Sequence, residues 1–447
     1  MKFFIKLLFL LSFSFTLAQE KPTVVLDLDG FLERVKENST DLKLVAKELE
    51  TAEANKKEAY STALPKIFSQ GGYTRNLTDY FSFMDFDIPP IQLGEDMTPL
   101  TFPEKFKVNY HNQFEFNTSL QQTLFSAQVG NAITASKQYA RMTEKYYDAG
   151  FLQIMVGAKK LFYQSLLLKK VFEVNQKSEA NARENYKMTQ NRFEAGTVSE
   201  LALYQAEVNW RNTIPNVTQA RKNFELALNN IKEMAGIDLN EVIELAGEFE
   251  NPPAMPDFPD LENILELRPD YNALKWQSKL LKTNINAQKS GFFPSLAGNI
   301  TYAYSSMSDD FKLERENNLW MIGLNLSIPI WTGGYTGAQV QKAQINYDKS
   351  QIELVKKEDA IAKELENIKL KLAEAEMRIA SAGSTLKTAE KGYSIARTSA
   401  ENGLATQLEL KDARLLFNQA ELGYYAAVCD YLVAYFDYEL AIGKMIE

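Results

Sequence analysis

The sequence has few of the residues on which catalytic and metal sites are commonly built. His111 is the only histidine and Cys429 the only cysteine among 447 residues. These counts exclude an intrachain disulfide, a zinc site of several Cys and His ligands, and a Ser-His-Asp or Cys-His nucleophile built with a second histidine. No acidic pair lies in a recognisable catalytic motif. We therefore expect no enzyme activity and no cofactor or metal site.

Long hydrophobic runs are also scarce. Residues 1–18 (MKFFIKLLFLLSFSFTLA) contain Lys2 and Lys6, then an apolar run, then small residues, which is the pattern of a secretory signal peptide. No later stretch reaches the roughly 18 apolar residues of a membrane-spanning helix. Gln19 follows the predicted cleavage site, so we expect no lipid anchor on an N-terminal cysteine. Contact with a membrane would then depend on strands.

Positive charge is in deficit. The chain has 49 Lys and Arg against 58 Asp and Glu, and loss of the two lysines in residues 1–18 leaves 47 minus 58, or −11. An acidic chain argues against nucleic acid as a partner.

Three sequence blocks recur in the same order, so the chain is internally duplicated. The aligned blocks are 38–65 with 267–294, 114–132 with 320–338, and 186–207 with 393–414. Each half predicts a helix, a strand, a loop, a strand, a very long helix, a turn and a helix. The predicted domains are a first repeat at 19–250, a Pro-rich connector at 251–260 and a second repeat at 261–447.

Apolar and polar residues alternate in the predicted strands. In 113–124 the apolar side chains are Phe114, Phe116, Leu120 and Leu124, and the second copy has Trp320, Ile322, Leu324, Leu326, Ile328 and Ile330. The preceding strands are predicted at 66–75 and 295–304. This pattern favours an outer-membrane barrel and a soluble antiparallel sheet about equally.

Four strands per chain are too few for a barrel, because spanning barrels have about eight or more strands and lipid tolerates no open strand edge. A membrane location therefore requires an oligomer. A dimer would supply eight strands and a trimer twelve, counted from the four predicted per chain.

Proline is absent from two long segments, which predicts very long helices. The expected helices cover 129–192 and 335–399, roughly 96 and 98 Å at 1.5 Å per residue. In the final helix, two series repeat every seven residues: Leu408, Leu415, Leu422, Cys429, Phe436 and Ala413, Ala420, Ala427, Ala434, Ala441. They predict two packing seams, as in a helical cylinder or a bundle, with Cys429 in the core.

Taken together, these features resemble the TolC family of outer-membrane efflux proteins. The specific motifs are Phe125 with its counterpart WTGG (331–334) at the strand-to-helix junction, the RFEAG turn (192–196) with its Gly403 counterpart, and RPD (268–270). The resemblance implies a mainly α fold with a membrane β-barrel. A homotrimer would form a 12-stranded β-barrel continuous with a periplasmic α-barrel, with four strands per chain.

The resemblance also implies a function and partners. The protein would be a passive exit duct that works with a periplasmic adaptor and an inner-membrane pump and contacts outer-membrane lipid. We expect small-molecule efflux, of a drug or a metal, with a pump of the resistance-nodulation-division type. Type I protein secretion with an ATP-driven pump is the alternative, and a soluble periplasmic coiled-coil scaffold is a further one.

Site residues follow from the resemblance. The adaptor would dock at two hairpin tips containing Arg192, Gly196, Thr197, Gly403 and Leu404. Glu409 and Asp412 would form acidic rings at the periplasmic entrance; the alternative is a solvated helix start, where acids suit the helix dipole. Phe125, Trp331, Gly333 and Gly334 would mark the strand-to-helix junction.

The loop at 76–112 is acidic and aromatic and would face the outside. It has no EF-hand spacing, so we expect a plain surface loop. We expect His111, near its end, to be a surface or interfacial side chain.

Overall fold

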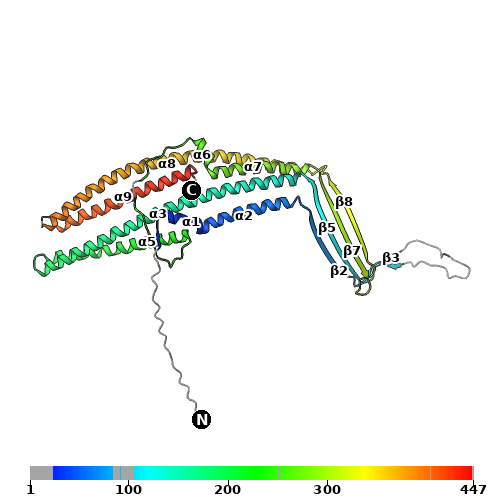
Figure 1. The fold of residues 1–447 in the computed structure, drawn as a ribbon, viewed down its shortest axis with the longest axis horizontal. Helices are drawn as coiled ribbons and strands as arrows, with labels where there is room; N and C mark the ends of the chain where they lie inside the picture. Colours follow the sequence, from blue (N-terminus) through cyan, green and yellow to red (C-terminus); the bar gives the residue numbers. More distant parts are fainter. Residues whose placement is uncertain (1–23, 84–90, 92–104, 250–251, 403, 445–447) are drawn as a thin grey trace, which may run out of the picture. The chain divides into compact units, whose positions relative to one another are not determined.

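The computed structural model describes residues 24–83, 91, 105–249, 252–402 and 404–444 (Figure 1). The predicted signal peptide, most of the loop at 76–112, and Gly403 lie outside these residues. The described chain divides into two units. One unit holds residues up to Glu48, Glu144–Ala273 and from Leu354 onward, and the other holds Leu49–Thr143 and Leu274–Glu353.

A four-stranded antiparallel sheet dominates the second of these units. Its strands are β2 (Lys66–Arg75), β5 (Asn112–Ser126), β7 (Ser295–Ser308) and β8 (Asn317–Ser327), in that spatial order. Figure 1 shows the four strands side by side. The sheet brings together strands from both repeats through the β5–β7 pairing, which has a register irregularity between Thr123 and Phe125.

The strand predictions are confirmed with one exception. The structure has strands at all four predicted places, but β8 ends at Ser327, so extending the strand to Ile328 and Ile330 was wrong. Pro329 explains the end of the strand, because proline has no backbone N–H to give to a sheet. Two short strands, β3 (Phe81–Phe83) and β4 (Lys105–Lys107), pair within the loop.

Both very long helices are confirmed. They are α3 (Ala127–Glu194) and α8 (Tyr335–Glu401), with 68 and 67 residues. The shorter helices α2 (Thr40–Ser61) and α7 (Pro269–Lys289) each precede a strand, and a 3-10 turn, η1 (Ser290–Phe292), follows α7. Among the described residues, no helix combines the length and the apolar character needed to cross a membrane.

The last helix of each repeat differs between the two copies. In the second repeat it is one helix, α9 (Gln407–Ala441), whereas in the first it is divided into α4 (Glu200–Arg211) and α5 (Thr213–Ala235). Pro215 near the start of α5 accounts for the division. Its ring would clash with the carbonyl group four residues earlier in a continuous helix.

The first unit has its own small sheet and core. Strands β1 (Val24–Leu26) and β6 (Ile243–Leu245) pair in parallel, and helices α1 (Leu28–Asn38) and α6 (Leu261–Leu267) lie in the same unit. The core cluster contains Phe31, Met155, Phe162, Ile231 and Leu245 from several of these elements. The repeat pattern in the sequence did not indicate β1, β6, α1 or α6.

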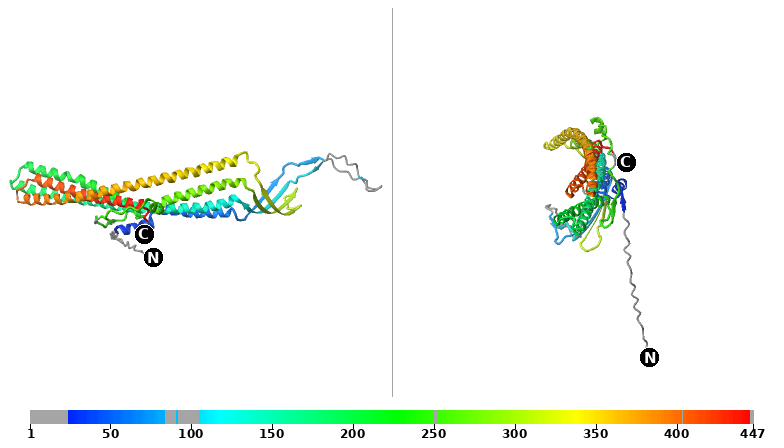
Figure 2. Two further views of the ribbon diagram at one scale, coloured as in Figure 1. Left: turned by 90° about the horizontal axis from the view of Figure 1, so that it is seen from above. Right: turned by 90° about the vertical axis from the view of Figure 1, so that its left-hand side faces the viewer.

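Helices α8 and α9 run side by side in the first unit (Figures 1 and 2). Cys429 and Phe436 of the predicted seam are buried, as is Ala434 of the second series. Burial raises the pKa of the Cys429 thiol to about 12, which agrees with its predicted core role. Leu408 and Leu415 of the same seam are exposed in the single chain.

Two tyrosines of α9 hold the connector between the repeats. The hydroxyl of Tyr431 donates to the Pro253 carbonyl at 2.7 Å, and that of Tyr438 donates to the Asp257 carbonyl at 2.6 Å. Phe258 packs edge-on against the Tyr438 ring. The described part of this Pro-rich segment is therefore packed against the helices.

Arg268, from the RPD motif, is a buried side chain at the centre of a partly exposed ionic network. Its guanidinium donates two hydrogen bonds to Asp270, at 2.9 and 2.8 Å, one to Glu364 at 2.6 Å and one to the Ala441 carbonyl at 3.2 Å. Lys357 also contacts Asp270 at 2.8 Å. Burial alone would raise the pKa of Asp270, but the hydrogen bonds from Arg268 and Lys357 hold it well below its usual range.

Candidate membrane face and hairpin tips

One face of the four-stranded sheet carries large apolar side chains on every strand; we call it the apolar face. The register places Leu120, Ile300 and Ile322 in one row across β5, β7 and β8. The face consists mainly of Ile67, Tyr73, Phe114, Phe116, Leu120, Leu296, Ile300, Tyr302, Tyr304, Trp320, Ile322, Leu324 and Leu326. Trp320 is 71% exposed and Ile322 82% exposed. A large exposed apolar patch marks a contact surface for lipid or protein.

The opposite face, which we call the polar face, carries mostly amide and hydroxyl side chains. They include Gln70, Thr74, Gln113, Asn117, Ser119, Gln121, Asn299, Thr301, Ser305 and Asn325. Ser119 and Thr301 form a hydrogen bond of 3.2 Å across β5 and β7. Strands β2 and β8 are each paired on one side only, so the sheet has two open edges among the described strands.

The two strand-to-helix junctions are built differently. Phe125 lies within β5, beside the register irregularity, and α3 begins two residues later. Trp331 lies outside β8 and is 85% exposed. Gly333 and Gly334 both have positive φ, at 59° and 82°, just before α8. The second junction therefore needs glycine for two consecutive left-handed residues, whereas the first passes directly from strand to helix.

The first hairpin tip is a Schellman turn at the end of α3. Gly196 has φ of 70°, and its N–H donates to the Phe193 carbonyl at 2.8 Å. The Thr197 N–H and hydroxyl both donate to the Arg192 carbonyl at 2.9 Å. Gly196 thus takes the left-handed conformation, which glycine adopts without steric cost. Ser199 then caps α4 by accepting from the Ala202 N–H.

The second tip repeats this geometry. The Leu404 N–H donates to the Ser399 carbonyl at 2.8 Å, and these residues align with Thr197 and Arg192 at the repeat offset of 207. Gly403 lies outside the described residues. Thr406 caps α9 at the position that aligns with Ser199 of the first tip.

Glu409 completes a capping box with Thr406. Its carboxylate accepts from the Thr406 N–H at 2.7 Å and hydroxyl at 3.0 Å, while its own N–H donates to the Thr406 hydroxyl. The hydrogen bond from the Thr406 N–H lowers the pKa of Glu409, so the carboxylate stays ionised at neutral pH. Asp412, less than one turn later, is exposed. Glu409 therefore has a helix-capping role whether or not it also lines an entrance.

An aromatic stack recurs in both hairpins. Tyr186 of α3 stacks on Trp210 of α4 with centroids 5.5 Å apart, and Tyr393 of α8 stacks on Phe417 of α9 at 5.6 Å. Both pairs are related by the offset of 207 residues. Trp210 also donates to Glu179 at 2.6 Å. The duplicated aromatic positions could have been found in the sequence alignment, but their contact depends on the hairpin geometry.

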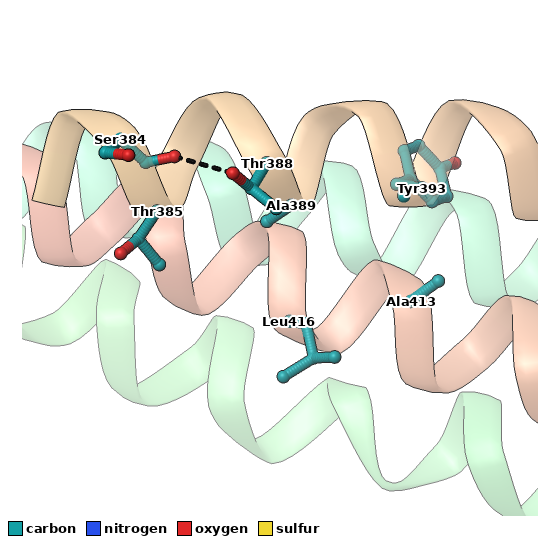
Figure 3. Close-up of a pocket in the computed structure, with 8 residues that line it drawn as sticks. Ser384, Thr385, Thr388, Ala389, Tyr393, Ala413 and Leu416 are labelled. Atoms are coloured by element: carbon teal, nitrogen blue, oxygen red, sulfur yellow. Dashed lines mark hydrogen bonds between the residues drawn. The ribbon is translucent and has the colours of Figure 1, made fainter.

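A groove between α8 and α9 lies beside the second stack (Figure 3). Its volume is about 480 Å³. Small and apolar side chains line it, among them Ala389, Gly392, Ala413 and Leu416. Thr388 on its wall donates its hydroxyl to the Ser384 carbonyl at 2.9 Å.

Charged residues at the loop end of the sheet pair with one another. Lys107 contacts Asp79 at 2.7 Å and Asp309 at 2.9 Å. The ring nitrogens of His111 lie 3.2 Å from Asp79 and 3.4 Å from Asp309. His111 is thus a partly exposed side chain between two carboxylates, as expected for a surface position. Within the described residues, no cluster of three or more His, Cys, Asp and Glu side chains is arranged to hold a metal ion.

The fold and these surfaces define a class of protein: a duplicated, mainly helical subunit that contributes four long strands, with one apolar and one polar face, and two helical hairpins. The family description "Outer membrane efflux protein" matches residues 31–237 and 261–443. The chain belongs to this outer membrane efflux protein family. The expected TolC-like fold, with its internal duplication and four long strands per chain, is confirmed.

Similar proteins include an outer membrane protein and a secretion protein. The chain is 22% identical over 275 residues to Outer membrane protein TolC of Salmonella enteritidis, covering 58% of this chain and 55% of that protein. It is 19% identical over 260 residues to Alkaline protease secretion protein AprF of Pseudomonas aeruginosa, covering 57% and 54%. Its match therefore spans about half the length of these relatives.

A solved structure covers more of the chain. The Campylobacter jejuni CmeC outer membrane channel aligns with a TM-score of 0.73 and 19% identity, over 93% of this chain and 85% of that one. At this identity the likeness establishes the fold.

Proposed function

We propose that the protein is an outer-membrane exit duct, formed by three copies of the chain, that conducts substrates passively out of the cell. The observation that carries this proposal is the four-stranded sheet with an apolar face, a polar face and two open edges. In lipid, an open edge leaves backbone N–H and C=O groups without partners. Pairing β8 of one copy with β2 of the next removes both edges and gives twelve strands in a trimer.

The helices support the same assembly. Leu370, Met377 and Ile395 of α8 are exposed and lie near one side of the helix, at spacings of 7 and 18 residues. Leu408 and Leu415 continue the α9 seam toward the tip and are exposed as well. A neighbouring copy would cover these side chains and complete an α-barrel.

The apolar face would contact outer-membrane lipid, and the polar face would line the water-filled interior. Trp331 and Phe125 at the junction would then lie at the membrane–water boundary, where aromatic rings are favoured. Gly333 and Gly334 would permit the turn from barrel strand to helix. Residues 1–18 would direct export to this compartment.

The hairpin tips would meet a periplasmic adaptor through Arg192, Gly196, Thr197, Gly403 and Leu404. The exposed Leu404 supports a contact role, because its side chain has no structural function in the turn. By threefold symmetry, Glu409 and Asp412 would form rings of negative charge at the entrance. The low pKa of Glu409 supports an ionised ring.

For the transported substrate we infer a small molecule, either a drug or a metal ion, delivered by a pump of the resistance-nodulation-division type. Protein secretion driven by an ATP-hydrolysing pump is the second candidate. It is favoured by the similarity to AprF, whose name assigns that protein to alkaline protease secretion.

The face assignment is tested by Ile322→Lys, with Asn325→Lys as the matched control on the opposite face of β8. A lysine in the lipid-facing band costs about 2–4 kcal/mol near the bilayer centre, whereas an interior lysine stays in water. We expect Ile322→Lys to reduce the amount of heat-resistant trimer in the outer membrane and Asn325→Lys to leave it near wild type. Equal assembly of both variants, or a soluble wild-type monomer, would contradict the proposal.

The partners are tested with a photo-crosslinking amino acid in place of Ala405, beside the second tip. Mass spectrometry of the captured proteins should identify an adaptor together with a resistance-nodulation-division pump. An ATP-driven exporter as its neighbour would favour secretion. If crosslinks formed only between copies of this chain, the proposed oligomer would stand and the proposed adaptor docking would have no support.

A further inference from the structure

Charge is almost absent from the polar face. Of the side chains that β2, β5, β7 and β8 present on this face, only Lys66 and Glu115 are charged. Lys66 is the first residue of β2, at the end where the strand follows α2. Glu115 lies on β5 toward the opposite end, four residues after its loop-side start.

Among the described residues, the Glu115 carboxylate has no neutralising partner. It is exposed, and no hydrogen bond or ion pair joins it to another described residue. Its neighbours in the sheet are Gly72 on β2 and Ser305 on β7. A Cβ atom added at Gly72 would meet nothing within 4 Å, so the side of Glu115 toward β2 is open.

The basic side chains described near Glu115 do not neutralise it. Arg75, three residues from Gly72 on β2, lies on the opposite face of the sheet. Lys66 lies six residues from Gly72 along β2, roughly 20 Å at 3.3 Å per residue. The basic side chains of Lys107 and His111 already face Asp79 and Asp309. On the described polar face, Glu115 is therefore a lone negative charge on an almost uncharged surface.

We propose that Glu115 is a specificity-determining residue of the duct, which favours cations and positively charged substrates in its outer, strand-lined part. This inference rests on the proposed function, because the polar face must line the pore. Three copies would place three carboxylates at one level. The Debye length is about 30 Å at 0.01 M salt and about 3 Å at 1 M, so their field would extend across the pore at low salt and be screened at high salt.

The test is ion selectivity of the purified full-length protein in planar bilayers. Reversal potentials are measured across a KCl gradient between about 0.01 and 0.1 M, and again at tenfold higher concentrations. Glu115→Gln removes the charge while keeping the shape. Lys66→Gln is the matched control, because it removes a positive charge from the same face. Migration of the heat-resistant trimer checks that each variant assembles.

At low salt, Glu115→Gln should lower the permeability ratio of K⁺ to Cl⁻ about twofold or more, and Lys66→Gln should raise it. Both effects should shrink at high salt. The measurements are repeated with Glu409→Gln and Asp412→Asn combined, so that the tip acids do not dominate selectivity. If Glu115→Gln trimers conduct with unchanged selectivity, both with and without the tip substitutions, the inference about Glu115 is overturned while the proposed duct function stands. A wild-type protein that forms no channel would overturn the proposed function as well.

Discussion

Removing the guanidinium of Arg268 should destabilise the helical unit far more than removing an exposed one. The Arg268 side chain is 7% exposed and binds Asp270, Glu364 and the Ala441 carbonyl. Breaking a buried ion pair from one side costs about 3–5 kcal/mol, because the other charge is left buried and unpaired. Here Asp270 keeps its ion pair with Lys357, and Glu364 is partly exposed. We therefore expect Arg268→Met to lower the free energy of unfolding by about 2–3 kcal/mol.

The matched control is Arg221→Met. Arg221 also hydrogen-bonds a carboxylate, that of Glu225 at 2.9 Å, but its side chain is 68% exposed. Exposed ion pairs between residues four apart on a helix contribute about 0.3–0.5 kcal/mol to the stability. Urea unfolding of the detergent-solubilised protein at pH 7, followed by far-ultraviolet circular dichroism, compares the two. Equal losses in both variants would refute the argument from burial.

The pH dependence supplies a second check on Arg268. The pKa of Asp270 is lower in the folded state than in the unfolded chain, so the unfolded state binds more protons as pH falls. The contribution of Asp270 to stability is therefore fully present above its unfolded pKa of about 3.9 and is lost at lower pH. Arg268→Met should weaken this acid-dependent loss. An unchanged slope of stability against pH below about 4 would show that Arg268 does not hold the Asp270 carboxylate ionised.

Three further outcomes follow from single side chains. Gly196→Ala should lower the stability by about 1–2 kcal/mol, because φ is positive at this residue. Gly423→Ala, inside α9 with open space around it, should leave the stability unchanged or raise it. Thermal unfolding compares the two variants. Cys429, 2% exposed with its pKa raised to about 12, should resist thiol reagents at pH 8 until the protein is denatured, so rapid labelling of the native protein would disprove its burial. In variants that keep one tryptophan, brominated lipids should quench Trp320 strongly and Trp210, which stacks on Tyr186, weakly; the reverse order would contradict the lipid-facing assignment.

The sequence by itself determined the features that depend on local periodicity. Alternation of apolar and polar residues located β5 and most of β8, the absence of proline located α3 and α8, and the glycine at 196 located a turn. Each of these signals arises from residues within a few turns or one strand. The duplication then assigned each element of the second repeat to its counterpart in the first.

Only the tertiary structure decided how distant segments pair. The parallel contact of β1 with β6, the β5–β7 register and the partners of Arg268 all join residues far apart in the chain. Local pattern specifies which face of an element is apolar, but it does not specify what covers that face. For the same reason the sequence indicated alternating strands, whereas the structure revealed Glu115 as a lone charge beside open space at Gly72.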